Sequence, residues 1–325
     1  LGSMFFGAIS GSPVSTVAAV GGILIPSMVS MGYKPEFCGA VHATAGPLGG
    51  LIPPSIALII YGVSANQSIS ILFVATVIPG ILMGCVLMVV AAVIAKRRGY
   101  GGSLYQSKTS GELLRESVWA LLMPIIILGG IYSGVFTPTE AAVVAAVYAM
   151  VVGFFIYREL HFKDMRAVCV DTVIGTATVM IIINFSTVFS WIIAMERLPQ
   201  IITESILSMT DNRYLVIGII TVILLVVGTF MDAAPAILIF TPVFLPLVVK
   251  LGYHPVHFGI MMCMNLLIGL STPPVGVTLF MASRLSGVKI DRIISEAWPF
   301  IFAMIGVLVL ITMFPQLSLW LPGFM

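Results

Sequence analysis

The chain has 325 residues, of which 59% are hydrophobic and only 9% are charged, with a formal net charge of +2. A soluble domain carries about a quarter charged residues, so this composition excludes an ordinary soluble protein and indicates a multi-pass membrane protein. The charge balance gives no sign of a nucleic-acid partner. We expect an all-α polytopic fold in contact with membrane lipid.

Apolar segments follow one another along the whole chain. A globular core helix is rarely so apolar for so long, so the segments predict helices within a membrane. Some are pairs of short arms around Gly, Pro or hydroxyl residues, which predicts re-entrant hairpins and broken helices. In chain order the segments are 4–9 and 13–29, 36–47 with 54–65, 69–95, 117–132, 139–157, 167–193, 213–229 with 233–249, 256–268 with 275–283, and 295–321.

Two parts of the chain match at a constant offset of 220 residues. Met31–Pro35 matches Leu251–Pro255, and Pro53-Pro54 matches Pro273-Pro274. No gap is needed from Pro26 to Pro79, and the match aligns Gly and Pro residues, which restrict backbone shape. We therefore predict an internal duplication. An odd number of crossings separates the two broken helices, so the two repeats should be inverted in the membrane.

Lysine and arginine are concentrated in a few loops. The loop at 96–116 begins with Lys96-Arg97-Arg98 and is predicted to be cytoplasmic, whereas those at 65–69 and 133–138 have no Lys or Arg and should lie outside.

The counterpart of the start of repeat two would precede Leu1, so we expect a longer protein with sequence before it. The predicted parts are repeat one at 1–96, the cytoplasmic loop with two scaffold spans at 97–165, and repeat two at 166–325.

Each repeat has two polar interruptions at membrane depth, a hairpin tip and a break in a helix. Unpaired backbone is costly in hydrocarbon, so paired breaks point to a binding site near the membrane midplane. Freed carbonyls and hydroxyls form oxygen cages suited to Na⁺, and half-helix N-termini attract anions. The alternative is that Gly and Pro only kink helices for packing. We predict two Na⁺ sites, formed by Ser12, Gly46 and Gly49 in repeat one and by Thr229, Asp232, Gly269, Ser271 and Thr272 in repeat two.

Asp232 is a carboxylate between two apolar arms. An isolated charge there is costly, so it should face a cavity, a cation or a hydrogen-bond donor. In the alternative, 213–229 spans the membrane fully and Asp232 lies at the membrane surface.

A substrate site is predicted where the two repeats differ. Ser10 corresponds to Phe230 and Ser55 to Val275, so repeat one has hydroxyls where repeat two is apolar. Matched features suit two copies of one ion, but a single organic acid needs unmatched ligands. We predict that Ser10 and Ser55 bind the acid, because a carboxylate there would accept hydrogen bonds from hydroxyls and free N–H groups. The alternative is that both serines only cap or pack.

Short motifs in both repeats resemble a known family. They are Ala8-Ile9-Ser10-Gly11-Ser12, Val17-Ala18-Ala19-Val20-Gly21, Ile25-Pro26, Leu51-Ile52-Pro53-Pro54-Ser55 and Tyr61-Gly62 in repeat one, and Gly228–Asp232, Thr241-Pro242 and Thr272-Pro273-Pro274 in repeat two. They resemble the large membrane subunit of tripartite ATP-independent periplasmic (TRAP) transporters, in some of which, including sialic-acid transporters, this subunit is fused behind a small one. The likeness covers essentially the whole chain.

The resemblance implies uptake of an organic acid, of the sialic acid or C4-dicarboxylate class, across the bacterial inner membrane. Two or more Na⁺ ions would drive it, and the hairpin-bearing domain would move like an elevator against a scaffold. It also implies two partners, a soluble periplasmic binding protein and a small four-helix membrane subunit, separate or fused.

Three other functions are weighed against this one. A stand-alone anion/Na⁺ symporter would lack the partner subunit. An intramembrane hydrolase using Ser10, or a channel, is disfavoured. The sequence has no G-x-S-x-G or H-E-x-x-H motif, and its four cysteines have no metal-ligand spacing, so we predict that the chain is not an enzyme.

Overall fold

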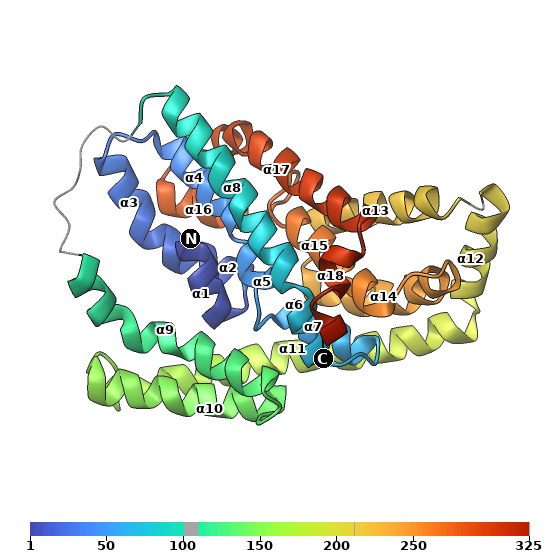
Figure 1. Cartoon of the computed structure of the whole chain (residues 1–325), viewed down its shortest axis with the longest axis horizontal. Coiled ribbons are helices and arrows are strands. Elements are labelled where there is room, and N and C mark those ends of the chain that lie inside the picture. Colours follow the sequence, from blue (N-terminus) through green and yellow to red (C-terminus); the bar gives the residue numbers. More distant parts are fainter. Residues whose placement is uncertain (101–109, 211, 325) are drawn as a thin grey trace. The chain divides into compact units, whose positions relative to one another are not determined.

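The computed structural model describes residues 1–100, 110–210 and 212–324, and within them the side chains outside 110–116, 202–203 and 206–209. Every regular element in these ranges is helical, which confirms the predicted all-α fold (Figure 1). The helices fall into two compact units. The larger unit comprises Leu1–Tyr105 and Ile192–Met325, and the smaller comprises Gln106–Trp191.

The larger unit contains both predicted hairpins and both predicted broken helices. Its helices are α1 (Gly2–Ser10), α2 (Pro13–Thr16), a π-helical turn (Val17–Gly21), α3 (Gly22–Ser30), α4 (Pro35–Ala45), α5 (Leu48–Leu51), α6 (Ile56–Ser64), α7 (Ile69–Ala75), α8 (Val77–Arg97), α12 (Leu198–Met209), α13 (Arg213–Phe230), α14 (Ala233–Lys250), α15 (Pro255–Gly269), α16 (Val277–Ser286), α17 (Ile290–Met313), α18 (Gln316–Leu319) and a 3₁₀ turn (Pro322–Phe324).

The smaller unit contains α9 (Ser110–Tyr132), α10 (Pro138–Val151), a π-helical turn (Val152–Ile156) and most of α11 (Met165–Met195). A capping box starts α10, because Thr137 Oγ1 accepts from Glu140 N at 3.3 Å and the Glu140 carboxylate accepts from Thr137 N at 2.8 Å. Residues 166–191 belong to this unit, although the duplication counts them with repeat two.

Seven helices or continuous helical runs in the described chain are long and apolar enough to cross a membrane. An eighth is added if Pro35–Leu51 and Ile56–Ser64, which are bent by 42° at a break, form one span. The multi-pass character predicted from composition is thereby confirmed. The seven spans, without the bent pair, are Pro13–Ser30, Ile69–Arg97, Pro138–Ile156, Met165–Met195, Arg213–Phe230, Ala233–Lys250 and Ile290–Met313.

Each hairpin tip is a short turn between two helices. In the first, α1 ends at Gly11, whose φ of 62° suits glycine, and Ser12 then caps α2 with Pro13 at the first helical position. In the second, α13 ends at Phe230 and Asp232 caps α14. Ser12 and Asp232 correspond at the offset of 220, so the two repeats place a capping residue at the same point.

The broken helices are interrupted where the sequence contains Pro-Pro. In repeat one the chain leaves α5 at Leu51 and re-enters a helix at α6, which Ser55 caps by accepting from Leu58 N at 3.3 Å. In repeat two the break separates α15 from α16, and Gly276 precedes α16 with a φ of 58°. Both breaks lie within the larger unit.

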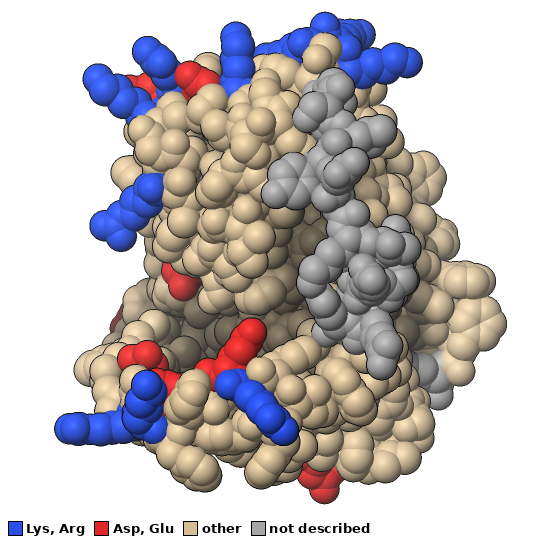
Figure 2. All heavy atoms as spheres, turned by 90° about the vertical axis from the view of Figure 1, so that its left-hand side faces the viewer, with Lys and Arg blue, Asp and Glu red and all other residues tan. Residues whose placement is uncertain are grey.

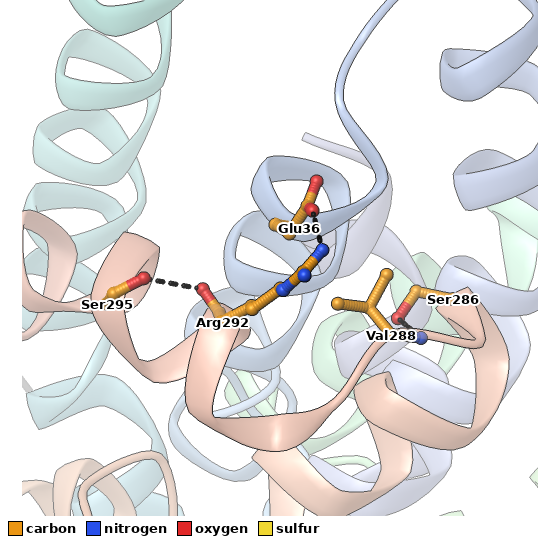
Figure 3. A network of polar contacts seen from close by, with 5 residues as sticks. All are labelled: Glu36, Ser286, Val288, Arg292 and Ser295. Atoms are coloured by element: carbon orange, nitrogen blue, oxygen red, sulfur yellow. Dashed lines mark hydrogen bonds and ion pairs between the residues drawn. The ribbon is translucent and has the colours of Figure 1, made fainter.

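Ion pairs connect three helices at one end of the larger unit. Arg292 of α17 lies 3.4 Å from Glu36 of α4, as Figure 3 shows. Arg98, just after α8, lies 2.8 Å from Glu296 of α17, and this carboxylate raises the pKa of the Arg98 guanidinium. Figure 2 shows Lys and Arg side chains gathered along the upper edge of the view. The predicted topology places all of these chain segments on the cytoplasmic side, which allows them to meet.

The two repeats also contact each other away from that end, through α6 and α15. The Tyr61 hydroxyl of α6 donates to the carbonyl of Pro255, the first residue of α15, at 2.7 Å. The Tyr61 ring lies against Gly259, where a Cβ would overlap it. Glycine is therefore required at the position where the helices of the two repeats approach each other.

Candidate functional site

The two hairpin tips line a single cavity of about 110 Å³. Hairpin one contributes Gly11–Val14 and hairpin two contributes Asp232–Ala234. The broken helices complete the wall, with Gly50, Ile56 and Ala57 from repeat one and Leu267 and Leu270 from repeat two. Residues more than 200 positions apart in the chain therefore line one cavity, and its wall combines polar and apolar residues.

Asp232 is exposed and lines this cavity. One carboxylate oxygen, Oδ1, accepts from Ala233 N at 2.7 Å, which leaves Oδ2 free of this capping contact. Ser12, its counterpart, also lines the cavity and accepts from Ser15 N at 3.5 Å. No Lys or Arg is among the described residues of the cavity wall. The cavity therefore presents a carboxylate, a hydroxyl and two helix N-termini.

The structure brings together the three residues predicted for the first Na⁺ site. A Cβ at Gly49 would overlap Thr16 Oγ1 and would lie 2.9 Å from the Ser12 carbonyl oxygen, and a Cβ at Gly46 would lie 3.2 Å from the Pro13 carbonyl oxygen. Hairpin one is thus packed tightly against α5. Glycine leaves room beside these oxygens, which a larger residue would fill.

Thr16 supplies a further oxygen beside Gly49, and the sequence did not single it out. Its Oγ1 donates to the Ser12 carbonyl at 2.9 Å and lies 3.2 Å from Ser10 Oγ, and the residue is fully buried. Its spacing of four residues from Ser12, one helical turn, is the signal that would have found it. Hydroxyl and carbonyl oxygens are the ligands that hard cations prefer.

The residues predicted for the second Na⁺ site occupy two places. Gly228 and Gly269 are in contact, so Thr229 lies beside the end of α15. Thr229 Oγ1 donates to Val226 O at 2.7 Å, and Thr272 Oγ1 donates to Ile268 O at 2.8 Å.

Ser271 and Asp232 have different neighbours. Ser271 Oγ donates to the carbonyl of Ala43 in repeat one at 3.2 Å and lies 3.2 Å from Thr278 Oγ1. Asp232 faces the cavity instead. Thr278, a fully buried residue that the sequence did not single out, donates to Ser271 Oγ, and Ser271 itself forms the bond to α4.

Ser10 and Ser55, the two serines predicted to bind the substrate, each precede a residue of one contact between hairpin one and the start of α6. Ser55 is fully buried, donates to the Gly50 carbonyl and caps α6. Ser10 is half-buried and bonded to Thr16. Their neighbours meet, since Ile56 N donates to Gly11 O at 3.4 Å, and these neighbours line the cavity. Neither serine is among the residues of the cavity wall.

Comparison with known proteins identifies the family to which the chain belongs. The chain matches the family described as "Tripartite ATP-independent periplasmic transporter, DctM component" over residues 1–317. It is 42% identical over 98% of its length to an isethionate TRAP transporter permease protein, DctMQ, of Oleidesulfovibrio alaskensis, but spans only about half of that relative, 51%.

Two other relatives have different named substrates. The chain is 39% identical, over 100% of its length, to the C4-dicarboxylate large permease DctM of Pseudomonas aeruginosa, and 38% identical, over 99%, to the sialic acid large permease SiaM of Vibrio cholerae. It covers 76% of each. The family and these relatives are transporter permeases, not enzymes. With its apolar spans, this chain is a multi-pass inner-membrane protein that belongs to the large permease (DctM) family of TRAP transporters.

Proposed function

We propose that the chain is the membrane core of a secondary transporter that takes up an organic acid through the cavity between the two hairpin tips. One observation carries the proposal: Ser12 and Asp232 correspond at the offset of 220, cap half-helices at the two tips, and line the same cavity. Inverted repeats that meet at a midplane site are the usual construction of secondary transporters.

Sodium coupling follows from the charges at this site. The Asp232 carboxylate repels an anion, and the described cavity wall has no Lys or Arg to offset it. Na⁺ bound by Asp232 and nearby oxygens would remove that repulsion, so the acid binds well only after the cation. The cluster of Ser12 and Thr16 oxygens beside Gly49 supports a second cation at the other tip. Bound Na⁺ supplies positive charge, and the half-helix N-termini orient the acid.

The substrate class is an organic acid. The named relatives are permeases for isethionate, C4-dicarboxylates and sialic acid, which share an acidic group and differ in the rest of the molecule. We further propose that a soluble periplasmic binding protein delivers the acid, and that a small membrane subunit, fused or separate, accompanies this one. The tripartite family description supports both partners.

An elevator motion is proposed for the step that exposes the site to each side of the membrane. Both hairpins and both broken helices belong to one compact unit, whereas α9, α10 and most of α11 belong to the other. This division supports movement of the hairpin-bearing unit as a rigid body against the smaller unit.

Uptake into proteoliposomes tests the proposal. The full transporter would be reconstituted, and labelled isethionate, succinate and sialic acid would each be supplied with an inward Na⁺ or K⁺ gradient, with and without the soluble binding protein. We expect accumulation of one acid that requires both Na⁺ and the binding protein. Uptake without the binding protein would instead indicate a stand-alone symporter, and uptake independent of Na⁺ would refute the coupling.

A further inference from the structure

A second cavity, of about 180 Å³, lies at the far end of α17 from the Glu36–Arg292 pair. Met313, the last residue of α17, lines it, whereas Arg292 lies in the first turn of that helix. The start of α13, the loop before α15 and the segment after α17 form the rest of the wall. From its lack of charge, the segment after α17 is predicted to be periplasmic, and hairpin two, which runs from the start of α13 to the loop before α15, is predicted to open to the same side.

This cavity is separate from the one between the hairpin tips. Arg213 lines it and begins α13, while the tip follows Phe230 at the other end of that 18-residue helix. At 1.5 Å per residue the two places are about 27 Å apart.

Two polar atoms at this cavity are buried without a partner. His257 is fully buried, and its Nδ1 lies 2.7 Å from Ser318 Oγ. The Thr312 backbone lies beside the ring, yet among the described residues no atom forms a hydrogen bond of normal geometry with Nε2. The Tyr253 hydroxyl is also buried and unpartnered. An unpaired buried polar group costs about 1–3 kcal/mol, so both atoms favour a ligand that bonds to them.

The hydrogen bonds around His257 show which ring atom is available. Ser318 Oγ donates to Pro315 O at 3.0 Å, so it accepts from Nδ1–H of His257. Nε2 of the neutral ring then has a lone pair and no proton, so His257 offers no donor to an anion. Burial raises the pKa of Tyr253, against the opposing effect of Arg213, so the hydroxyl keeps its proton and remains a donor.

The remaining wall is suited to an organic anion. Arg213 donates one N–H to Tyr214 Oη at 2.8 Å, and a guanidinium has five N–H donors. No Asp or Glu is among the described residues of this wall. Met313, Pro315 and Leu319 provide apolar surface. A carboxylate carries a hydrocarbon stem that such surface accommodates, which chloride and phosphate lack.

We propose that this cavity binds a carboxylate, held by Arg213 and Tyr253, at a site separate from the transport cavity. The carboxylate belongs either to a free organic acid or to an acidic side chain of a soluble partner, since both present the same group. Either source reaches the cavity from the periplasmic side.

Ligand-observed NMR on the purified full protein tests the site. Acetate represents a free acid and a capped glutamate, N-acetylglutamate amide, represents a protein side chain, each titrated at constant Na⁺ and ionic strength with chloride as the replacing anion. Arg213→Gln removes the charge from an exposed residue, and Tyr253→Phe removes only the hydroxyl. Arg197→Gln, which changes an arginine in the loop after α11, is the matched control.

We expect saturable binding of at least one probe, weakened about tenfold by Arg213→Gln and by Tyr253→Phe and unchanged by Arg197→Gln. Acetate binding identifies a free acid as the ligand, and binding of the capped glutamate alone identifies a partner side chain. Absence of saturable binding by both probes, or equal affinity in both variants and wild type, would overturn the proposal. Both variants keep Ser12 and Asp232, so a failure here is distinct from a failure of transport.

Discussion

At the scale of single residues, Asp232 has two roles that can be separated. It caps α14 through Ala233 N and presents its charge to the cavity. An asparagine keeps an oxygen for the cap and loses the charge, whereas an alanine loses both. The cap affects folding, and the charge is the part proposed to bind the cation.

We predict that Asp232→Asn and Asp232→Ala both abolish Na⁺-driven uptake in proteoliposomes, because neither retains the carboxylate that binds the cation. Only Asp232→Ala should also lower stability, by about 1 kcal/mol, because it loses the cap. Uptake and the thermal midpoint are measured on the same preparations. Undiminished uptake by a folded Asp232→Asn protein would remove Asp232 from the Na⁺ site.

The two serines predicted to bind the acid should differ in their effect on stability. Losing a charge-assisted hydrogen bond costs about 1.5–3 kcal/mol, so Ser10→Ala and Ser55→Ala should weaken substrate dependence about ten- to a hundredfold and Na⁺ dependence less. Ser55→Ala should in addition destabilise the protein, because Ser55 is buried and caps α6. Substrate and Na⁺ titrations of uptake measure the change in dependence, and the thermal midpoint measures the change in stability, with the exposed Ser15→Ala as control. If both variants retain wild-type substrate dependence, the acid binds elsewhere.

At the scale of helices, close packing of hairpin one depends on glycine. Gly49 faces Thr16 and the Ser12 carbonyl, and a Cβ there has no room. Gly228 and Gly269 form the corresponding contact in repeat two. The backbones of hairpin and broken helix approach closely in both repeats, which places the tip oxygens beside the breaks.

Gly49→Ala should therefore force hairpin one away from α5. Overpacking of this kind costs about 1–3 kcal/mol, so we expect a lower thermal midpoint and weaker Na⁺ binding. The matched variant is Gly306→Ala in α17, where a Cβ would meet nothing within 4 Å and alanine favours the helix by up to about 1 kcal/mol. A Gly49→Ala protein as stable as wild type, with unchanged Na⁺ affinity, would contradict this packing argument.

At the scale of the whole molecule, the inverted topology can be tested without transport. Lys34 follows hairpin one and Lys250 ends hairpin two, and both are exposed. Inversion places them on opposite sides of the membrane.

Single cysteines at Lys34 and Lys250 should be labelled from opposite sides by a membrane-impermeant maleimide. The background lacks Cys38, Cys85, Cys169 and Cys263, two of which are exposed. In intact cells only the Lys250→Cys protein should react, and the Lys34→Cys protein should react after the membrane is permeabilised. Labelling of both from one side would rule out inverted repeats.

The amino-acid sequence by itself determined the fold class, the family and the positions of the turns and breaks. These depend on local properties: the length of an apolar run, the φ that Gly11 adopts, the N–H that each proline lacks. The match at offset 220 paired Ser10 with Phe230 and Ser55 with Val275 from sequence positions alone.

Only the tertiary structure decided which groups meet. It added Thr16 to the first cluster of oxygens, joined Ser271 to α4, and buried Ser55 against Gly50. None of these contacts follows from the pattern of apolar and breaking residues, because that pattern determines where each helix ends but not how it rotates against another. The cavity at His257 is the clearest example, since its wall combines three segments that are distant in the chain, and the unpaired state of a buried atom exists only after they have packed.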